Sequence, residues 1–531
     1  MEKMNAMRRT FLDKGKLYWP VVVLAVLFLY CYGNTPLVAD QYVATGLYID
    51  AGGLVNYTTG YCFWWLCNVN ARFFSTLVCG IIEQSVVTNR LGMLAVLCAI
   101  PLMGMLALNT KKNRILYLLL SCASILLVSA GIQQEVYFYA GLLYLGVVVL
   151  AEAVAFMTVR LLEKKPDVRF GCGYLLLTMV ASLWLESLTA ALFVVYICLL
   201  LYHYVKTCRL SRWLSASVIV SGICLYMMMH QRNEYLDKQT TDIRELVHQV
   251  RQVFDVLYYD NAAVTAILSL LLALFFALQW QRTMNKVARK GYVVFALVSL
   301  YTGITHASQA YNVQLTAWQQ AASLSENVNV IPSAMLHVTS TLLLPPSCNA
   351  VRFFLYLLLT LFILIAVVLQ RNNLEYLILA CVAIVNVGVV SVTSVAIANA
   401  MGGVGQRMVT PSLLLLVVIM AAVTAENLRP DENFVVIKVI LIAATIFFLL
   451  KADDYYVRFT RVGKIHRQNL LQIESCAEQQ RLGVWDLETD ILTLQSIEND
   501  LWVYNLEEDD PRYPYFCHFY HLREGTLVEY Q

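Results

Sequence analysis

The 531-residue chain is 59% hydrophobic and only 14% charged, whereas soluble globular domains contain about 25% charged residues. A net charge of +2 favours neither a nucleic-acid partner nor a strongly acidic one. With a mean hydropathy of +0.63, the chain is predicted to be a membrane protein. Its apolar runs reach the roughly 20 residues that a helix needs to cross a bilayer, so helices are expected rather than barrel strands.

The first apolar run predicts an uncleaved membrane span at about 17–38. Basic residues precede it, and no small-residue cleavage site follows it. The positive-inside rule therefore keeps the N-terminus in the cytoplasm, and the first span exits near Asp40.

Residues 61–82 are apolar enough to resemble a second span, but polar residues recur on one helical face. Such a stripe is typical of a helix that lies in the membrane interface. Charge parity supports this interpretation. If 61–82 does not cross, the basic turn Lys111-Lys-Asn-Arg114 and four later basic turns all face the cytoplasm. Residues 36–90 then form a long first outer loop.

Under this parity the sequence predicts an all-α polytopic membrane protein of about thirteen spans. The later spans are expected near 91–109, 115–131, 138–159, 170–187, 188–205, 213–230, 263–280, 291–305, 350–369, 374–392, 408–425 and 434–450. The turn 426–432 fits least well, because it is more acidic than basic. Residues 1–450 make up the transmembrane domain. Residues 451–531 form an extracytoplasmic segment with a small α+β fold.

Charged side chains near membrane depth are costly and often functional. Five such residues, distant in the chain, are expected to meet at the outer interface: Asp40, Arg72, Glu135, Glu186 and Arg407. An arginine fork suits a phosphate or diphosphate, and a carboxylate can take the proton of an acceptor hydroxyl. Such a set suits the transfer of a polar group from a lipid carrier. The 14 cysteines show no metal-ligand spacing, so no metal or cofactor is expected.

Each of these residues also has a structural alternative. Asp40 would cap the next helix, and Arg72 would extend from an interfacial helix towards lipid phosphates. Glu186 would pair with another buried group or end a helix pair, and Arg407 would be an ordinary boundary charge. His306, a further candidate, is more often a satisfied polar residue than a base.

The layout resembles the GT-C superfamily of glycosyltransferases, which use polyprenyl-phosphate sugars. The resemblance rests on the Asp-bearing outer loop, the amphipathic helices before the second span and the number of spans. Short motifs carry it further towards an uncharacterised bacterial group associated with surface polysaccharide. These are Leu37-Val-Ala-Asp40-Gln-Tyr, Asn70-Ala-Arg72-Phe-Phe, Glu186 and Asp500-Leu-Trp-Val-Tyr-Asn505.

The resemblance implies an inverting transfer of a hexose or pentose at the outer face of the bacterial cytoplasmic membrane. A lipid-linked sugar would be the donor, and a glycan or glycolipid the acceptor. Asp40 would serve as base, while Arg72 and Arg407 would bind the carrier phosphate. Many members have two nearby acids, whereas Gln41 follows Asp40 here, so no metal is implied. The alternatives are a lipid-linked glycan transporter, which would place its essential charges at the midplane, and a polysaccharide polymerase or envelope assembly factor.

Overall fold

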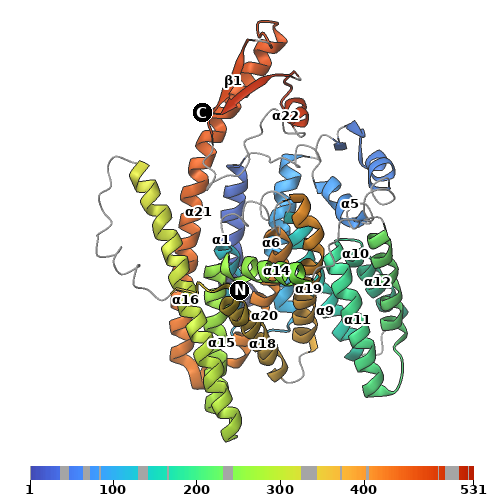
Figure 1. Ribbon diagram of the computed structural model, residues 1–531, viewed down its shortest axis with the longest axis vertical. Helices are drawn as coiled ribbons and strands as arrows, with labels where there is room; N and C mark the ends of the chain where they lie inside the picture. Colours follow the sequence, from blue (N-terminus) through green and yellow to red (C-terminus); the bar gives the residue numbers. More distant parts are fainter. Residues whose placement is uncertain are drawn as a thin grey trace.

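Long helices standing side by side make up most of the molecule (Figure 1). The computed structural model describes residues 2–35, 47–48, 50–63, 72–82, 85–128, 141–163, 167–230, 243–324, 344–370, 374–401, 406–487, 489–496, 513–523 and 525–530. Eleven helices in these ranges are long and apolar enough to cross a membrane. They are α1 (Glu2–Gly33), α6 (Val86–Ala107), α9 (Gly141–Glu163), α11 (Glu186–Thr207), α12 (Arg212–His230), α15 (Ala262–Arg282), α16 (Lys286–Leu324), α18 (Asn349–Leu369), α19 (Leu374–Met401), α20 (Gln406–Asn427) and α21 (Pro430–Arg481). The chain is therefore a mainly helical, multi-pass membrane protein.

Two predicted spans are shorter than expected. The helices α7 (Arg114–Leu127) and α10 (Val168–Ser182) have 14 and 15 residues. At about 1.5 Å per residue they measure roughly 21–23 Å, less than the ~30 Å hydrocarbon core of a bilayer. The apolar sequence after α10 continues through Leu183-Trp-Leu185, where the backbone leaves the helix. Hydropathy alone therefore overestimated the length of this helix.

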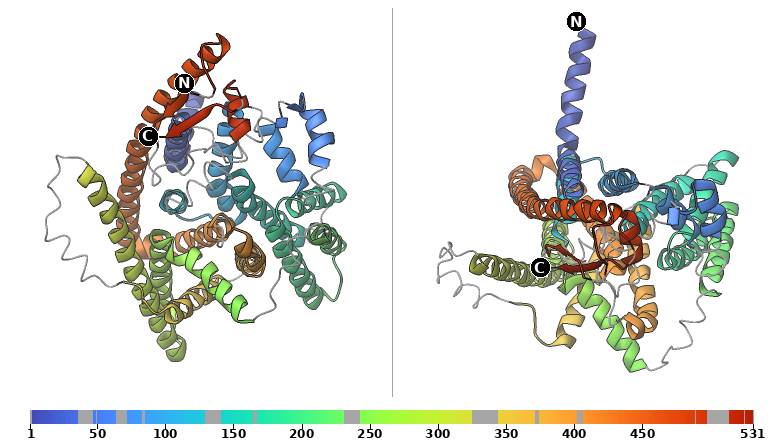
Figure 2. Two further views of the ribbon diagram at one scale, coloured as in Figure 1. Left: turned by 45° about the horizontal axis from the view of Figure 1, so that its top comes forward. Right: turned by 90° about the horizontal axis from the view of Figure 1, so that it is seen from above.

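The most deeply buried helix is α20. It packs against α7, α9, α15, α18 and α19, and nearly every side chain from Val409 to Ala425 is buried. A helix that is apolar on all sides belongs inside a bundle. Towards α19, the Asn386 amide donates a hydrogen bond to the Ser412 hydroxyl at 2.8 Å. Seen from two directions, α16 and α21 stand on one side of the bundle, and α10, α11 and α12 on the opposite side (Figures 1 and 2).

Three turns meet at one end of the bundle, here called the basic end. The Asn113 amide donates to the carbonyls of Ala425 and Leu428, and Arg282 donates to the carbonyl of Asn427. Glu426 accepts hydrogen bonds from the backbone amides of Lys111 and Lys112. Arg282 also lies 3.7 Å from Glu432. The acidic turn that fitted the charge parity least well therefore has basic partners within the structure.

The opposite end, here called the loop end, carries the exit of α1 and the start of α6. The Arg90 guanidinium donates to the carbonyl of Thr35 at 3.0 Å. Short elements also belong to the first loop and to the segment after α12: α3 (Leu54–Asn56), the π-helix η1 (Tyr57–Cys62), α5 (Phe73–Ile82), α14 (Ile243–Phe254) and the π-helix η3 (Asp255–Tyr259). With ten residues, α5 is too short to cross a membrane.

The last long helix, α21, packs along the first. Tyr30 is hydrogen-bonded to Thr460 at 2.6 Å, and Arg467 donates to Asn34 at 3.1 Å. A Cβ on Gly463 would lie only 2.1 Å from the Asn34 Oδ1 atom, so this approach requires glycine. Because α21 continues without a break after a kink at Asn433 as far as Arg481, the predicted domain boundary at residue 450 falls inside a helix.

Beyond the bundle, the end of α21 carries a small cluster of elements (Figure 1). β1 (Ile491–Leu494) and β2 (Leu527–Tyr530) pair in parallel, next to α22 (Tyr513–Phe519). Their buried side chains share a separate apolar core with Ile473 and Cys476 of α21. The Gln480 amide fixes the arrangement by donating to the Thr526 hydroxyl at 2.8 Å and accepting from the Arg523 backbone amide at 2.7 Å.

The two ends should lie on opposite sides of the membrane. We expect alkaline phosphatase fused after Arg72, near the loop end, to be active outside the cell, and the same fusion after Lys112, at the basic end, to be inactive. A fluorescent reporter that matures only in the cytoplasm should give the reverse pattern. Equal activity at both positions would contradict this topology.

Candidate functional site

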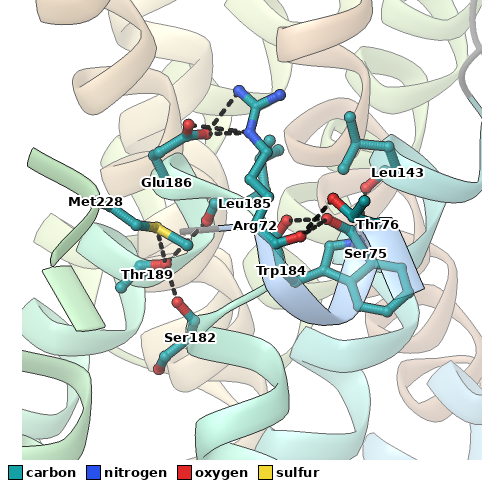
Figure 3. Close-up of polar contacts among 10 residues, drawn as sticks. All are labelled: Arg72, Ser75, Thr76, Leu143, Ser182, Trp184, Leu185, Glu186, Thr189 and Met228. Carbon is teal, nitrogen blue, oxygen red and sulfur yellow. Dashed lines mark hydrogen bonds and ion pairs between the residues drawn. The ribbon is translucent and has the colours of Figure 1, made fainter. Parts of the chain in front are cut away.

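The helix α5 is fixed to the turn between α10 and α11. The Phe74 amide donates to the Leu183 carbonyl at 3.2 Å, and the Ser75 hydroxyl donates to the Trp184 carbonyl at 2.8 Å. Trp184 is itself held by a hydrogen bond from its indole nitrogen to the Leu143 carbonyl at 2.8 Å (Figure 3). A segment of the first loop is therefore joined to the interior of the bundle by backbone groups as well as side chains.

The turn beneath α5 begins where Leu183 leaves the helical conformation and ends where α11 starts at Glu186. The Thr189 hydroxyl donates to the Ser182 carbonyl at 2.7 Å, which bridges the two helix ends. Glu186 is thus the first residue of α11. A carboxylate at a helix N-terminus is favoured by the partial positive charge there.

Arg72 and Glu186 form a multidentate ion pair (Figure 3). The Arg72 Nε atom donates to both carboxylate oxygens at 2.9 Å, and Nη2 lies 2.8 Å from Oε2. The side chains are only 19% and 8% exposed. A charge-assisted contact of this kind is strong when it is shielded from water.

The pair keeps Arg72 charged. Burial alone would lower the pKa of the guanidinium, but the negative charge of Glu186 and the hydrogen bond to it raise that pKa above its ordinary value. Arg72 is therefore a permanent cation that is directed into the protein. The described geometry does not show Arg72 extending towards lipid headgroups. It shows Arg72 as a buried partner of Glu186, which is the structural alternative for Glu186.

A small, partly open pocket adjoins the pair. Its polar lining comes from Arg72, Glu186, Tyr144 and Ser187, and its apolar lining from Leu185, Val389, Val390 and Met408. Five separate parts of the chain thus contribute to one pocket at the loop end. A charged wall facing an apolar wall suits a ligand with a polar group attached to an apolar chain.

The other predicted site residues are placed differently. Arg407 is the second residue of α20 and directly precedes Met408 in the pocket lining, while its side chain is outside the described part of the structure. Asp40 and Glu135 also fall outside the described residues. The structure therefore brings Arg72 and Glu186 together and places the backbone of Arg407 beside them.

His306 lies elsewhere, buried in α16, and is not part of the pocket lining. Its Nδ1 atom is 2.8 Å from the Thr302 carbonyl and its Nε2 atom is 3.0 Å from the Tyr356 hydroxyl. A carbonyl only accepts, so Nδ1 donates and Nε2 accepts from Tyr356. The ring is a satisfied polar group, as the structural alternative for this residue predicted.

Sequence reasoning missed Tyr144 and Ser187 in the pocket and Glu152 in the bundle. Tyr144 lies in an apolar run that gives no sign of a site, whereas Ser187 adjoins a predicted residue. Glu152 had a usable signal, because it is a lone acid between Val147 and Met157 in a predicted span. Within the described ranges, no group of three or more His, Cys, Asp or Glu side chains is placed to hold a metal ion.

No protein-family model matches the chain, and no curated protein matches it in sequence. The class that the fold defines is a multi-pass membrane protein with a buried arginine–glutamate pair beside a pocket at one end of its bundle.

Proposed function

We propose that this protein is a GT-C-type glycosyltransferase. It moves a sugar from a polyprenyl-phosphate carrier to a glycan or glycolipid at the outer face of the bacterial cytoplasmic membrane. The observation that carries the proposal is the buried Arg72–Glu186 pair, which lines a pocket at the end of the bundle where the first loop lies.

The pair suits the phosphate of a lipid carrier. Glu186 engages the Nε and Nη2 atoms of Arg72 and holds the guanidinium plane in one orientation. The positive charge would then stand beside the departing phosphate without reorganising, which stabilises the charge that develops in the transition state. The apolar side chains of Val389, Val390 and Met408 would contact the first part of the polyprenyl chain.

The reaction inverts the anomeric carbon. The acceptor hydroxyl attacks that carbon and forms a new C–O bond, while the bond to the carrier phosphate breaks and polyprenyl phosphate leaves. In this proposal Asp40 takes the proton of the acceptor hydroxyl, and Arg407 supplies a second positive charge to the phosphate. The role of Asp40 follows from the resemblance to GT-C enzymes.

A lipid-linked glycan transporter is the second candidate, and one observation favours it. Glu152 is completely buried halfway along α9, which is where transporters place their binding groups. The Arg72–Glu186 pair lies instead at the first residue of α11, at the end of the bundle. That position favours transfer at the membrane surface.

A panel of polyprenyl-phosphate sugars, incubated with the purified full-length protein, separates the two functions. We expect release of polyprenyl phosphate with one donor in the presence of acceptor glycans. The same protein in vesicles is tested for movement of fluorescent lipid-linked sugars between leaflets. Carrier movement without turnover of any donor would overturn the transferase proposal in favour of transport.

A further inference from the structure

Glu152 occupies an unusual position for an acid. It lies in the middle of α9, eleven residues from either end, and its side chain is completely buried. Among the described residues, neither of its carboxylate oxygens has a hydrogen-bond partner. An ionised carboxylate in such surroundings costs several kcal/mol. The side chain is therefore expected to carry a proton.

The hydroxyl of Tyr117 lies close to this carboxyl group. A Cβ on Gly104 of α6 would lie 2.8 Å from the Glu152 Oε1 atom and 2.5 Å from the hydroxyl of Tyr117 on α7. Both oxygens thus approach the α6 backbone so closely that residue 104 must be glycine. Val418 of α20 also lies 2.6 Å from the same point.

Buried hydroxyls continue from this region towards the basic end. The polar neighbours of Tyr117 include Ser121, Glu152 and Tyr376 of α19. The neighbours of Tyr376 are Thr110 and two acids, Glu375 and Glu426. Glu426 receives the backbone amides of Lys111 and Lys112 in the turn at the basic end. The series therefore reaches from the middle of the bundle to its surface.

The hydroxyl groups of this series are shielded from solvent. Thr110, Tyr117, Ser121 and Tyr376 are each at most 2% exposed, and a proton can pass along buried hydroxyls because each can accept one proton and donate another. Besides Tyr117, the titratable group that α7 brings to this region is Cys122, and α19 brings Tyr376 and Glu375.

We propose that Glu152 is an intramembrane proton-binding site that exchanges its proton with the basic end along Tyr117, Tyr376 and Thr110. The carboxylic O–H bond breaks as a new O–H bond forms on the adjoining oxygen, and the reverse step restores the acid. A proton fits the site better than a metal ion, because one carboxylate and one hydroxyl are too few ligands for a hard cation. This inference does not rest on the transferase activity.

Infrared spectroscopy of the full-length protein in liposomes tests the site. We expect a carbonyl stretching band of a protonated, apolar carboxylic acid that shifts in D₂O. Glu152→Gln should remove this band. Glu163→Gln, which alters an exposed acid at the end of the same helix, should leave it unchanged. The double variant Thr110→Val with Tyr376→Phe should keep the band and slow its isotope exchange severalfold.

Three results would overturn the proposal. They are a band that survives Glu152→Gln, a wild-type band that never shifts in D₂O, and unchanged exchange in the hydroxyl variant. The test of the wild-type band in D₂O needs no variant. It can therefore refute the proposal even if none of the substituted proteins folds. Helical content measured by circular dichroism identifies variants that have lost the fold.

Discussion

Arg72→Ala is expected to destabilise the folded protein by about 3–5 kcal/mol, because Glu186 would keep a buried charge without its cation. Glu186→Leu should cost a similar amount for the converse reason. The double variant Arg72→Met with Glu186→Leu removes both charges, and apolar replacements of a buried ion pair are often neutral or stabilising. It should therefore recover most of the lost stability. Apparent melting temperatures in one detergent give the order of the four proteins.

The sugar-transfer activities of these four proteins should not follow the order of their melting temperatures. If Arg72 binds the carrier phosphate, the double variant remains inactive although it is stable. A double variant that regains both stability and transfer would show that the pair is only structural. Arg429→Ala is the matched control, since it breaks an arginine–glutamate pair whose side chains are 55% and 52% exposed. Such an exposed pair is worth about 0–1 kcal/mol, so this variant should keep both properties.

Asp40→Ala is expected to reduce sugar transfer by about a hundredfold to ten-thousandfold, the usual contribution of general acid–base catalysis. The melting temperature and the membrane insertion of the variant should equal those of the wild type. Initial rates of carrier release at saturating donor measure the effect.

Asp50→Ala provides the control from the same loop. The Asp50 side chain is 61% exposed, lies 3.8 Å from His518 in the C-terminal segment and has no role in the proposed chemistry. It should transfer sugar at the wild-type rate. Full activity of Asp40→Ala would remove Asp40 from the mechanism, whereas equal losses in both variants would indicate a general role of the loop.

The membrane class of the fold could be predicted because apolar runs of sufficient length have one stable solution in lipid. The number of crossings was less certain. Hydropathy does not report where the backbone leaves a helix, so the apolar residues Leu183 to Leu185 were assigned to a span although they form a turn. The acidic turn at Glu426 did not fit the charge parity. The sequence does not show that it contacts Lys111, because the two residues are 315 positions apart.

The sequence indicates which charged side chains are costly to place near the membrane. It does not indicate how these side chains are arranged in space. Arg72 and Glu186 are 114 residues apart, and nothing in their spacing indicates a direct contact. Tyr144 has the same appearance in the sequence as any aromatic residue in a span. Glu152 was overlooked because only charges expected at the outer interface were considered, although a lone acid inside a predicted span is also a candidate.

The central position of α20 has a consequence for the biogenesis of the protein. This helix ends at Asn427, yet it packs on α7 and α9, which are complete by Glu163. At about 5–20 residues per second, a ribosome needs roughly ten to fifty seconds to proceed from α9 to α20. During that time the surfaces of α7 and α9 that contact α20 in the finished protein lack this native neighbour. Newly made chains should therefore depend on a membrane insertase that shelters these surfaces until the last helices arrive.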